Sequence, residues 1–448
     1  MTFLKKPLPI LGLIILGYAI IHVPLIFSGF GEPDGWRTGL AALGWGKGLG
    51  YEPSRFPGFP VVELTYGVIA EFSPWESLWI YTNLSTLILT LVGIYFYYQI
   101  VLYHKISHPL TTVLLLYFIP AVFVNASSSM DYLWTITFIL IAYWSLLQKR
   151  PTIGGIFLGF SIGARLTTGI FLLPFLLFLV LNPKIFPQKN AIRNIIRFVS
   201  SALIISVICY SPLIIKYYLG FLNTLYPHRD FLRSGYYVMQ MIFGLPGSIC
   251  LIVFIVIKRK GLIQWNWELS LWGLIIAAYL ILFLVKPEKV EYLMPMFPFA
   301  VLWIARWLNR KNITIFTSLV IFNNILSFLV FQPEPEGLKM NWIAKGITYQ
   351  KYVSYQNYLQ DTRFLIQYPY LPDSVVVVAW REAGVGYLLE LPFYQARKDE
   401  LLKNRIVFSH NSGKQWRKNT YLVQGSHREK RGDPSLGNVV IVYPPSTL

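Results

Sequence analysis

Long apolar runs separated by short polar junctions follow one another from residue 8 to residue 331. A run of roughly 18 or more apolar residues is long enough to cross a bilayer as a helix. The pattern predicts membrane-spanning segments at 8–28, 76–102, 109–125, 132–147, 153–165 with 168–182, 198–215, 236–257, 268–285, 294–309 and 313–331. Counting 153–182 as two passes gives about eleven transmembrane helices.

The segment 153–182 carries a charged residue, Arg165, inside its apolar run. Residues 153–164 would form a helix of only about 18 Å, which is too short for a hydrocarbon core of about 30 Å. The chain is therefore expected to reverse near Arg165, inside the membrane or at its outer edge. Irregular backbone at that depth needs protein or a wet cavity beside it, and an arginine there is costly and indicates a function.

Basic residues mark every second junction between the predicted spans. These junctions hold Lys5, Lys6, His104, Lys105, Lys149, Arg150, Lys184, Lys189, Arg193, Arg197, Lys258, Arg259, Lys260, Arg306, Arg310 and Lys311. Because cytoplasmic loops carry an excess of Lys and Arg, the pattern places the N-terminus in the cytoplasm and the C-terminus outside it. Residues 9–27 are expected to remain as an uncleaved first helix in the plasma (inner) membrane.

The first outer loop, residues 29–76, is long, polar and rich in Gly and Pro, and it includes an interfacial helix predicted over 61–72. Asp34 lies six residues past Ser28 at the mouth of the first helix, where a carboxylate can act as a general base toward a hydroxyl. Its alternative role is that of a solvated residue in a Pro-Asp-Gly turn. Glu32 is the nearest rival for the role of base.

Two further charges of this loop are candidates for the site. Arg55 lies in SRFPGFP, a rigid segment, and can bind a phosphate bidentately, although it also suits the lipid headgroup level. Glu63 begins the interfacial helix, where it either binds a ligand or favours the helix dipole.

The other outer junctions are denser in charge than the rim of a membrane protein needs. Asp131 follows SSSM and either caps the next helix or contributes to the site. The remaining candidates are His228, Arg229, Lys286, Lys289, Glu291 and Tyr292. Together with Arg165, the basic members of this set gather positive charge on the outer side, where a lipid phosphate or pyrophosphate would lie.

The composition changes after residue 331, where Pro333, Pro335 and Gly337 mark a boundary. Residues 338–448 are polar, with strands predicted at 375–380, 406–409, 421–424 and 438–443 and helices at 350–366 and 393–404. The chain therefore divides into a membrane domain, 1–331, and a small soluble α/β domain, 338–448, outside the membrane.

The overall composition agrees with a membrane protein. Of the 448 residues, 55% are hydrophobic and only 13% are charged, against about 25% charged in soluble domains. The net charge of +18 follows from the basic junctions and tail, and the chain has no nucleic-acid recognition motif. Cys209 and Cys250 both lie in apolar runs, so neither a disulfide framework nor a metal site is indicated. P-loop, Rossmann, HExxH and GxSxG motifs are also absent, so a soluble nucleotide is not indicated as the energy source.

Several segments, in their order along the chain, carry a resemblance to a known family. They are EPDGW with Asp34, SRFPGFP, SMDYLW with Asp131, GGIFLGFSIGARLTTG with Arg165, and KPEKVEYLMPMFPF. As a set they resemble the GT-C superfamily of polytopic glycosyltransferases, in particular bacterial members akin to protein-mannosyltransferases and lipid A aminoarabinose transferases. The resemblance covers roughly residues 1–331.

The resemblance implies an all-α polytopic membrane bundle with interfacial helices in the first loop. It implies transfer of a sugar, with inversion, from a polyprenyl-phosphate donor to an extracytoplasmic lipid, glycan or protein. Asp34 would be the base and Arg165 a contact of the donor phosphate, helped by Arg55, Lys286, Lys289 and Arg229. Sugar or acceptor contacts would come from Glu63, Asp131, Glu291, Tyr292 and His228. No cofactor is certain, and a divalent metal is left open.

Two other functions fit the same features. A secondary transporter or flippase would share the broken helix and the intramembrane arginine, but no inverted repeat is visible between the halves. A non-catalytic membrane scaffold would tolerate substitution of Asp34 and Arg165.

Overall fold

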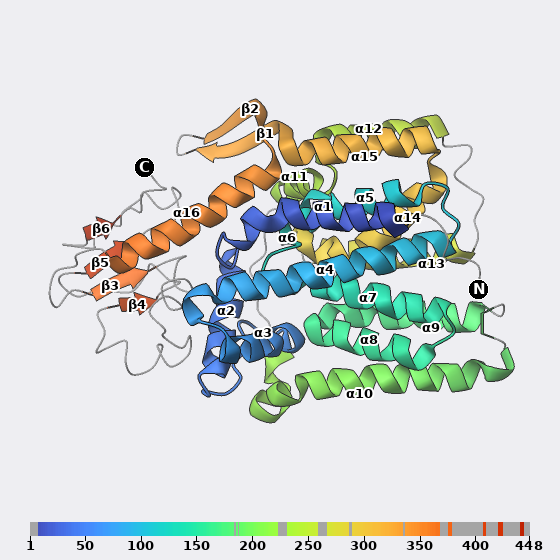
Figure 1. Ribbon diagram of the computed structural model, residues 1–448, viewed down its shortest axis with the longest axis horizontal. Helices are drawn as coiled ribbons and strands as arrows, with labels where there is room; N and C mark the ends of the chain where they lie inside the picture. The colour runs from blue at the N-terminus through green and yellow to red at the C-terminus, as the bar shows by residue number, and fades with distance from the viewer. Residues whose placement is uncertain are drawn as a thin grey trace.

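The computed structural model describes residues 8–182, 185–186, 188–222, 231–258, 267–285, 289–334, 337–367, 375–378, 406–408, 420–423 and 440–442. Its helices form a bundle whose long members run in roughly the same direction, with α2 and α3 gathered at one end (Figure 1). The helices of the first half are α1 (Leu8–Ile26), α2 (Pro33–Gly46), α3 (Pro60–Phe72), η1 (Trp75–Ser77), α4 (Leu78–Tyr103), α5 (Pro109–Tyr117), α6 (Pro120–Asn125), α7 (Tyr132–Leu147), α8 (Pro151–Ala164), η2 (Leu166–Phe171), α9 (Leu172–Leu181), η3 (Gln188–Asn190), α10 (Ala191–Tyr217) and η4 (Gly220–Leu222).

The second half adds seven helices, counting η6, and all the strands that the structure describes. They are α11 (Phe231–Ile242), α12 (Gly244–Lys258), α13 (Trp267–Val285), η6 (Val290–Met296), α14 (Phe297–Trp307), α15 (Arg310–Ile325), β1 (Leu326–Glu334), β2 (Gly337–Lys345), α16 (Ile347–Gln367), β3 (Val375–Val378), β4 (Ile406–Phe408), β5 (Thr420–Val423) and β6 (Val440–Val442).

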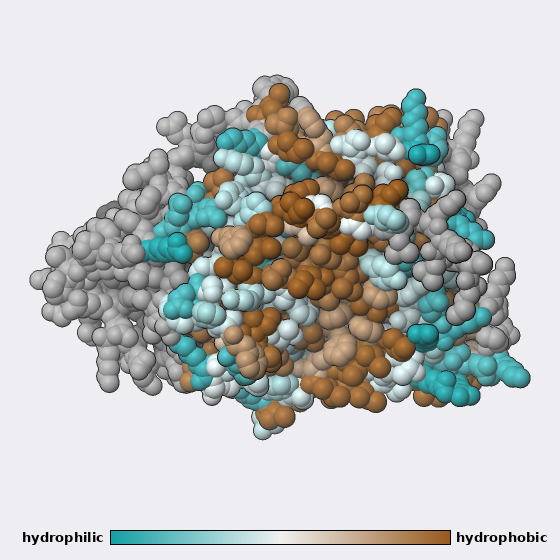
Figure 2. Space-filling model, viewed as in Figure 1, coloured by the Kyte–Doolittle hydropathy of each residue, from teal (hydrophilic) through white to brown (hydrophobic). Residues whose placement is uncertain are grey.

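Four helical stretches are long and apolar enough to cross a membrane: Pro9–Ile26, Trp75–Tyr103, Ala191–Tyr217 and Trp267–Val285. Shorter apolar helices lie at Tyr132–Leu147, Pro151–Ala164, Leu166–Leu181 and Gly244–Ile257. Figure 2 shows the matching surface, a hydrophobic band across the helices with hydrophilic surface toward both ends. The chain therefore has the make-up of a multi-pass membrane protein. The count of about eleven spans stays a prediction.

The break at Arg165 is confirmed. Helix α8 ends at Ala164, Arg165 adopts an extended backbone (φ −156°, ψ 112°), and the chain returns through η2 into α9. A second predicted span, 109–125, is also divided, because Pro120 begins α6 and proline disfavours helical geometry in the residue before it. The span 236–257 is divided between α11 and α12 at Gly244, whose φ of +66° favours glycine.

The last predicted span, 313–331, is wrong in its final third. Helix α15 ends at Ile325, and the apolar residues that follow form β1, which pairs antiparallel with β2. An apolar run of this length does not by itself distinguish a helix from a strand, and here the pairing partner decides.

Beyond the hairpin, α16 confirms the helix predicted over 350–366. All four predicted strands are present, as β3 to β6, and they pair in parallel in the order β4-β3-β5-β6. The helix predicted over 393–404 lies outside the described residues, and the division into two domains stays a prediction.

Two buried clusters organise the bundle. The larger runs through its length, with fully buried Tyr97, Tyr143 and Phe175 among its members. The smaller lies at the end occupied by the first loop and joins Phe30 and Trp36 to Trp134 and, from α16, Tyr358. The first loop and α16 are thus parts of one packed unit at this end.

Candidate active site

Arg165 is the centre of the candidate site. Arg165 is only 4% exposed, and its Nε donates a hydrogen bond to Asp131 Oδ2 at 2.5 Å. The guanidinium carbon lies over three rings, 4.5 Å from that of Tyr132, 5.2 Å from that of Tyr292 and 5.8 Å from that of Phe59. Within the described part of the chain, Arg165 Nη2 is buried without a hydrogen-bond partner. A buried donor without a partner is costly and indicates that a ligand completes it.

Asp131 and Tyr132 place two more unmatched groups beside Arg165. Asp131 occupies the N-cap position of α7, but its side chain makes no capping hydrogen bond, so the capping alternative does not hold. Its Oδ1 and the hydroxyl of Tyr132 are buried and have no hydrogen-bond partner among the described residues. The sequence analysis missed Tyr132, and its only signal was its place next to Asp131.

Asp34 lies in the first turn of α2, which Pro33 begins. It is buried and surrounded by cations: Arg55 donates to Oδ2, Lys289 Nζ lies 2.6 Å from the same oxygen, and Arg37 lies 3.3 Å from Oδ1. Burial alone would raise the pKa of Asp34, but Arg55, Lys289 and Arg37 outweigh it and hold the pKa far below its usual range. Asp34 is therefore an ionised, paired carboxylate rather than a solvated turn residue.

Glu32 extends this network away from the cavity. Its Oε1 lies 2.6 Å from Lys351 Nζ, and its Oε2 lies 3.6 Å from Lys289 Nζ. Burial raises the pKa of Glu32, but Lys351 and Lys289 lower it to about 2 overall. The contacts of Glu32 and Asp34 involve four cations, so this network carries a surplus of two positive charges and favours a bound anion.

Glu63 has a different place from the one predicted for a sugar ligand. It is buried in the first turn of α3 and accepts hydrogen bonds from Tyr51 Oη, from the Ser54 N–H at 2.8 Å and from the Phe59 N–H at 3.1 Å. The loop from 51 to 59 is thereby wrapped around its carboxylate, which fixes the segment that carries Arg55. Glu63 does not line the cavity described next.

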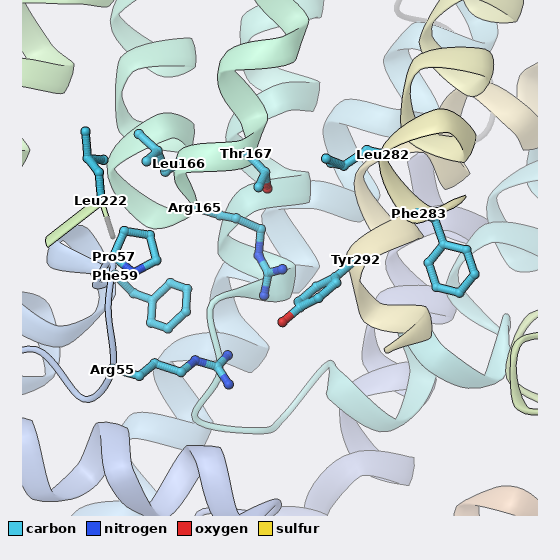
Figure 3. Close-up of a pocket in the computed structure, with 10 residues that line it drawn as sticks. All are labelled: Arg55, Pro57, Phe59, Arg165, Leu166, Thr167, Leu222, Leu282, Phe283 and Tyr292. Atoms are coloured by element: carbon cyan, nitrogen blue, oxygen red, sulfur yellow. The ribbon is translucent and has the colours of Figure 1, made fainter. Parts of the chain in front are cut away.

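A cavity of about 200 Å³ lies between this loop, the break at Arg165 and the end of α13. It is lined by Arg55, Pro57, Phe59, Arg165, Leu166, Thr167, Leu222, Leu282, Phe283 and Tyr292. Figure 3 shows the guanidinium groups of Arg55 and Arg165 approaching one another at one side, with the ring of Tyr292 beside them. Two cations thus face an otherwise largely apolar cavity.

Glu291 and Tyr292 come from η6. Glu291 is 1% exposed, and its Oε2 has no hydrogen-bond partner in the part of the chain that the structure describes. Burial and the nearby charge of Glu32 raise the pKa of Glu291. The three other predicted residues, His228, Arg229 and Lys286, lie outside the described residues.

The first-loop carboxylates Asp34 and Glu32 do not fit a divalent metal. Asp34 and Glu32 are engaged by arginine and lysine, and the described residues contain no group of three His, Cys, Asp or Glu arranged to hold an ion. Cations in the positions where a metal would lie oppose its binding.

Comparison of the chain with protein-family models, with curated proteins and with solved structures gives no match. The resemblance to the GT-C superfamily therefore stays a prediction.

Proposed function

We propose that the chain is a membrane glycosyltransferase that moves a sugar from a polyprenyl-phosphate donor to an extracytoplasmic acceptor with inversion. The observation that carries the proposal is the pair Arg55 and Arg165 on a largely apolar cavity, with the carboxylate of Asp34 bound to one of the two arginines. A phosphate joined to a hydrocarbon chain combines the two chemistries that this cavity offers.

The donor would bind with its phosphate between the two guanidinium groups. Arginine binds phosphate oxygens bidentately, and Arg165 Nη2 is a buried donor that still lacks a partner among the described residues. Phe59, Leu282 and Phe283 would contact the first isoprene units. At about 200 Å³ the cavity is smaller than the roughly 300–1,000 Å³ of whole-ligand pockets, so it would hold the phosphate and the adjoining lipid rather than the entire donor.

The reaction would break the bond between the sugar's anomeric carbon and the phosphate oxygen. The bonding electrons go to the polyprenyl phosphate, and Arg55 and Arg165 stabilise the charge that develops there. The acceptor hydroxyl attacks the opposite face of the sugar and gives its proton to Asp34. In the unliganded site Asp34 is a weak base because three cations hold its pKa low. A phosphate that draws Arg55 toward itself would raise the proton affinity of Asp34, while Lys289 stays on the carboxylate and holds its orientation.

Three polar atoms that are unmatched among the described residues suit a sugar; they belong to residues next to Arg165 or Tyr292 and do not line the cavity itself. Asp131 Oδ1 and Glu291 Oε2 are acceptors, and the Tyr132 hydroxyl is both donor and acceptor. In the membrane we place the site on the extracytoplasmic side of a GT-C-like bundle of about eleven spans. The acceptor is a lipid, a glycan or a protein.

The test is a transfer assay in membranes with a panel of radiolabelled polyprenyl-phosphate sugars, comparing wild type with Asp34→Asn. We expect one donor to give a labelled product and the variant to lose at least a thousandfold of that activity, because Asn cannot accept the proton. The matched control is Glu71→Gln, an exposed carboxylate of the same loop, which should keep full activity.

Two outcomes would contradict the proposal. Folded wild-type protein that transfers no sugar from any donor, but moves a labelled lipid or sugar across vesicles, would favour the transporter alternative. Full activity of Asp34→Asn would remove Asp34 as the base.

A further inference from the structure

Helix α16 lies against the candidate site, where Lys351 contacts Glu32 across 319 positions of the sequence. Figure 1 shows α16 extending from the β1–β2 hairpin along the end of the bundle where α2 lies. The ring of Tyr358 stacks on Trp36 of α2, with centroids 5.4 Å apart and an angle of 30°. The ring of Tyr355 packs next to Gly31, just before α2. A Cβ atom added to Gly31 would lie 3.5 Å from that ring.

From this docked helix, Lys351 begins a line of alternating charges that leads to the cavity. Lys351 Nζ lies 2.6 Å from Glu32 Oε1, Glu32 Oε2 lies 3.6 Å from Lys289 Nζ, and Lys289 Nζ lies 2.6 Å from Asp34 Oδ2. Asp34 in turn contacts Arg55, which lines the cavity. Lys289 is therefore shared between two carboxylates, and it lies closer to Asp34.

The position of Lys289 between Asp34 and Glu32 depends on Lys351. Glu32 is only 8% exposed, and a buried carboxylate without a close cation is costly. If Lys351 lost its charge, Lys289 would be the next cation that Glu32 could engage. Lys289 would move toward Glu32 and away from Asp34.

We propose that Lys351 is a positioning residue of the transfer reaction: by neutralising Glu32 it leaves Lys289 on Asp34, so the C-terminal helix α16 completes the site. This inference rests on the proposed function. It assigns to α16 an electrostatic part in the reaction in addition to its packing on Trp36.

An electrostatic role and a purely structural role of Lys351 predict different kcat values for a double variant. Lys351→Met should lower kcat about tenfold, while the KM for the donor changes less than twofold, because Lys351 does not line the cavity. Glu32→Gln removes the carboxylate that would draw Lys289 away. In the Glu32→Gln background, Lys351→Met should therefore lower kcat less than twofold.

The experiment measures kcat and donor KM for wild type, Lys351→Met, Lys351→Arg, Glu32→Gln and the double variant Glu32→Gln/Lys351→Met. Lys351→Arg should restore at least half of the wild-type kcat, because it keeps the charge. The matched control is Lys345→Met: this exposed lysine precedes α16 and donates to Tyr349 Oη, so its loss should leave kcat unchanged.

The outcomes separate this inference from the proposed function. An active wild type with Lys351→Met at full kcat overturns the inference alone. A loss in Lys351→Met that Glu32→Gln does not reduce also overturns it, since α16 would then act only by packing. A folded wild type that transfers nothing overturns both.

Discussion

Two buried polar clusters at opposite ends of α4 differ in one instructive way. The His104 cluster, at the C-terminal end, consists of His104, Glu268, Tyr143, Trp272 and Arg306. The Arg165 cluster, near the N-terminal end, consists of Arg165, Asp131, Tyr132, Asp34, Arg55 and Lys289. Both join several helices, but only the second borders a cavity lined by two arginines.

In the His104 cluster most polar groups have a hydrogen-bond partner, although among the described residues His104 Nδ1 has only its ion-pair contact with Glu268. His104 Nε2 lies 3.0 Å from Tyr143 Oη, and His104 Nδ1 lies 3.3 Å from Glu268 Oε1. Trp272 Nε1 donates to Tyr143 Oη at 3.3 Å, and Arg306 donates to the His104 carbonyl at 3.1 Å. These contacts hold α4, α7, α13 and α14 together. They leave little for a ligand to complete.

The Arg165 cluster instead keeps unmatched donors and acceptors, which cost stability in the folded chain. Arg165 Nη2, Asp131 Oδ1 and the Tyr132 hydroxyl are all in this state among the described residues. Unmatched buried groups also occur away from the cavity in the described part of the chain, as at the hydroxyls of Tyr117 and Tyr279, so the clusters differ mainly in that the Arg165 cluster borders the cavity with two arginines.

The largest expected effect on transfer distinguishes Arg165 from Arg306, one arginine of each cluster. Arg165→Met should lower transfer about a thousandfold, because it removes a preorganised contact of the leaving phosphate, and it should also destabilise the chain by leaving Asp131 buried without its cation. Arg306→Met loses one hydrogen bond to a backbone carbonyl and should keep transfer within twofold. Activity per folded molecule, with folded protein quantified by size-exclusion chromatography, checks both. Equal losses in the two variants would remove the functional distinction.

The next effect contrasts two buried tyrosines. Tyr132→Phe should lower transfer about tenfold while the melting temperature stays the same or rises, because its hydroxyl has no hydrogen-bond partner to lose among the described residues. Tyr143→Phe should lower stability and leave transfer unchanged. It removes the partner of His104 and Trp272, so it should cost about 1–3 kcal/mol of stability and leave transfer by folded protein unchanged. Thermal unfolding in detergent and the transfer assay measure the pair. A destabilised Tyr132→Phe would show that the hydroxyl is structural.

The smallest effect concerns pH and the Glu32 carboxylate. Its pKa is about 2 in the folded chain, below its usual value near 4.5. Because the folded pKa is lowered, the stability that ionised Glu32 contributes is present above pH 4.5 and is lost as the pH falls toward 2. The difference in melting temperature between wild type and Glu32→Gln should therefore be constant from about pH 8 to 5 and narrow below about pH 4.5. A difference that widens on acidification would show that Glu32 is not held ionised by Lys351 and Lys289.

The sequence alone determined the features that depend on local pattern. Apolar runs predicted the helices of the bundle, because a segment in lipid must satisfy its backbone hydrogen bonds within itself. The length limit located the break at Arg165, and period and turn residues located β3 to β6. Asp34, Arg55, Arg165 and Lys289 were also recognised as candidates, since charges beside apolar runs are conspicuous.

How these residues pair follows from the tertiary structure and not from local sequence. Packing surrounds Asp34 with three cations and places the Glu63 carboxylate within the loop that carries Arg55. It leaves the Tyr132 hydroxyl without a hydrogen-bond partner in the described part of the chain. It turned residues after Ile325 into a hairpin and brought Lys351 to Glu32. The physical reason is the same in each case. Helix formation depends on residues a few positions apart, whereas ion pairs, strand pairs and unmatched buried groups depend on which distant segments the packing brings within a few ångströms.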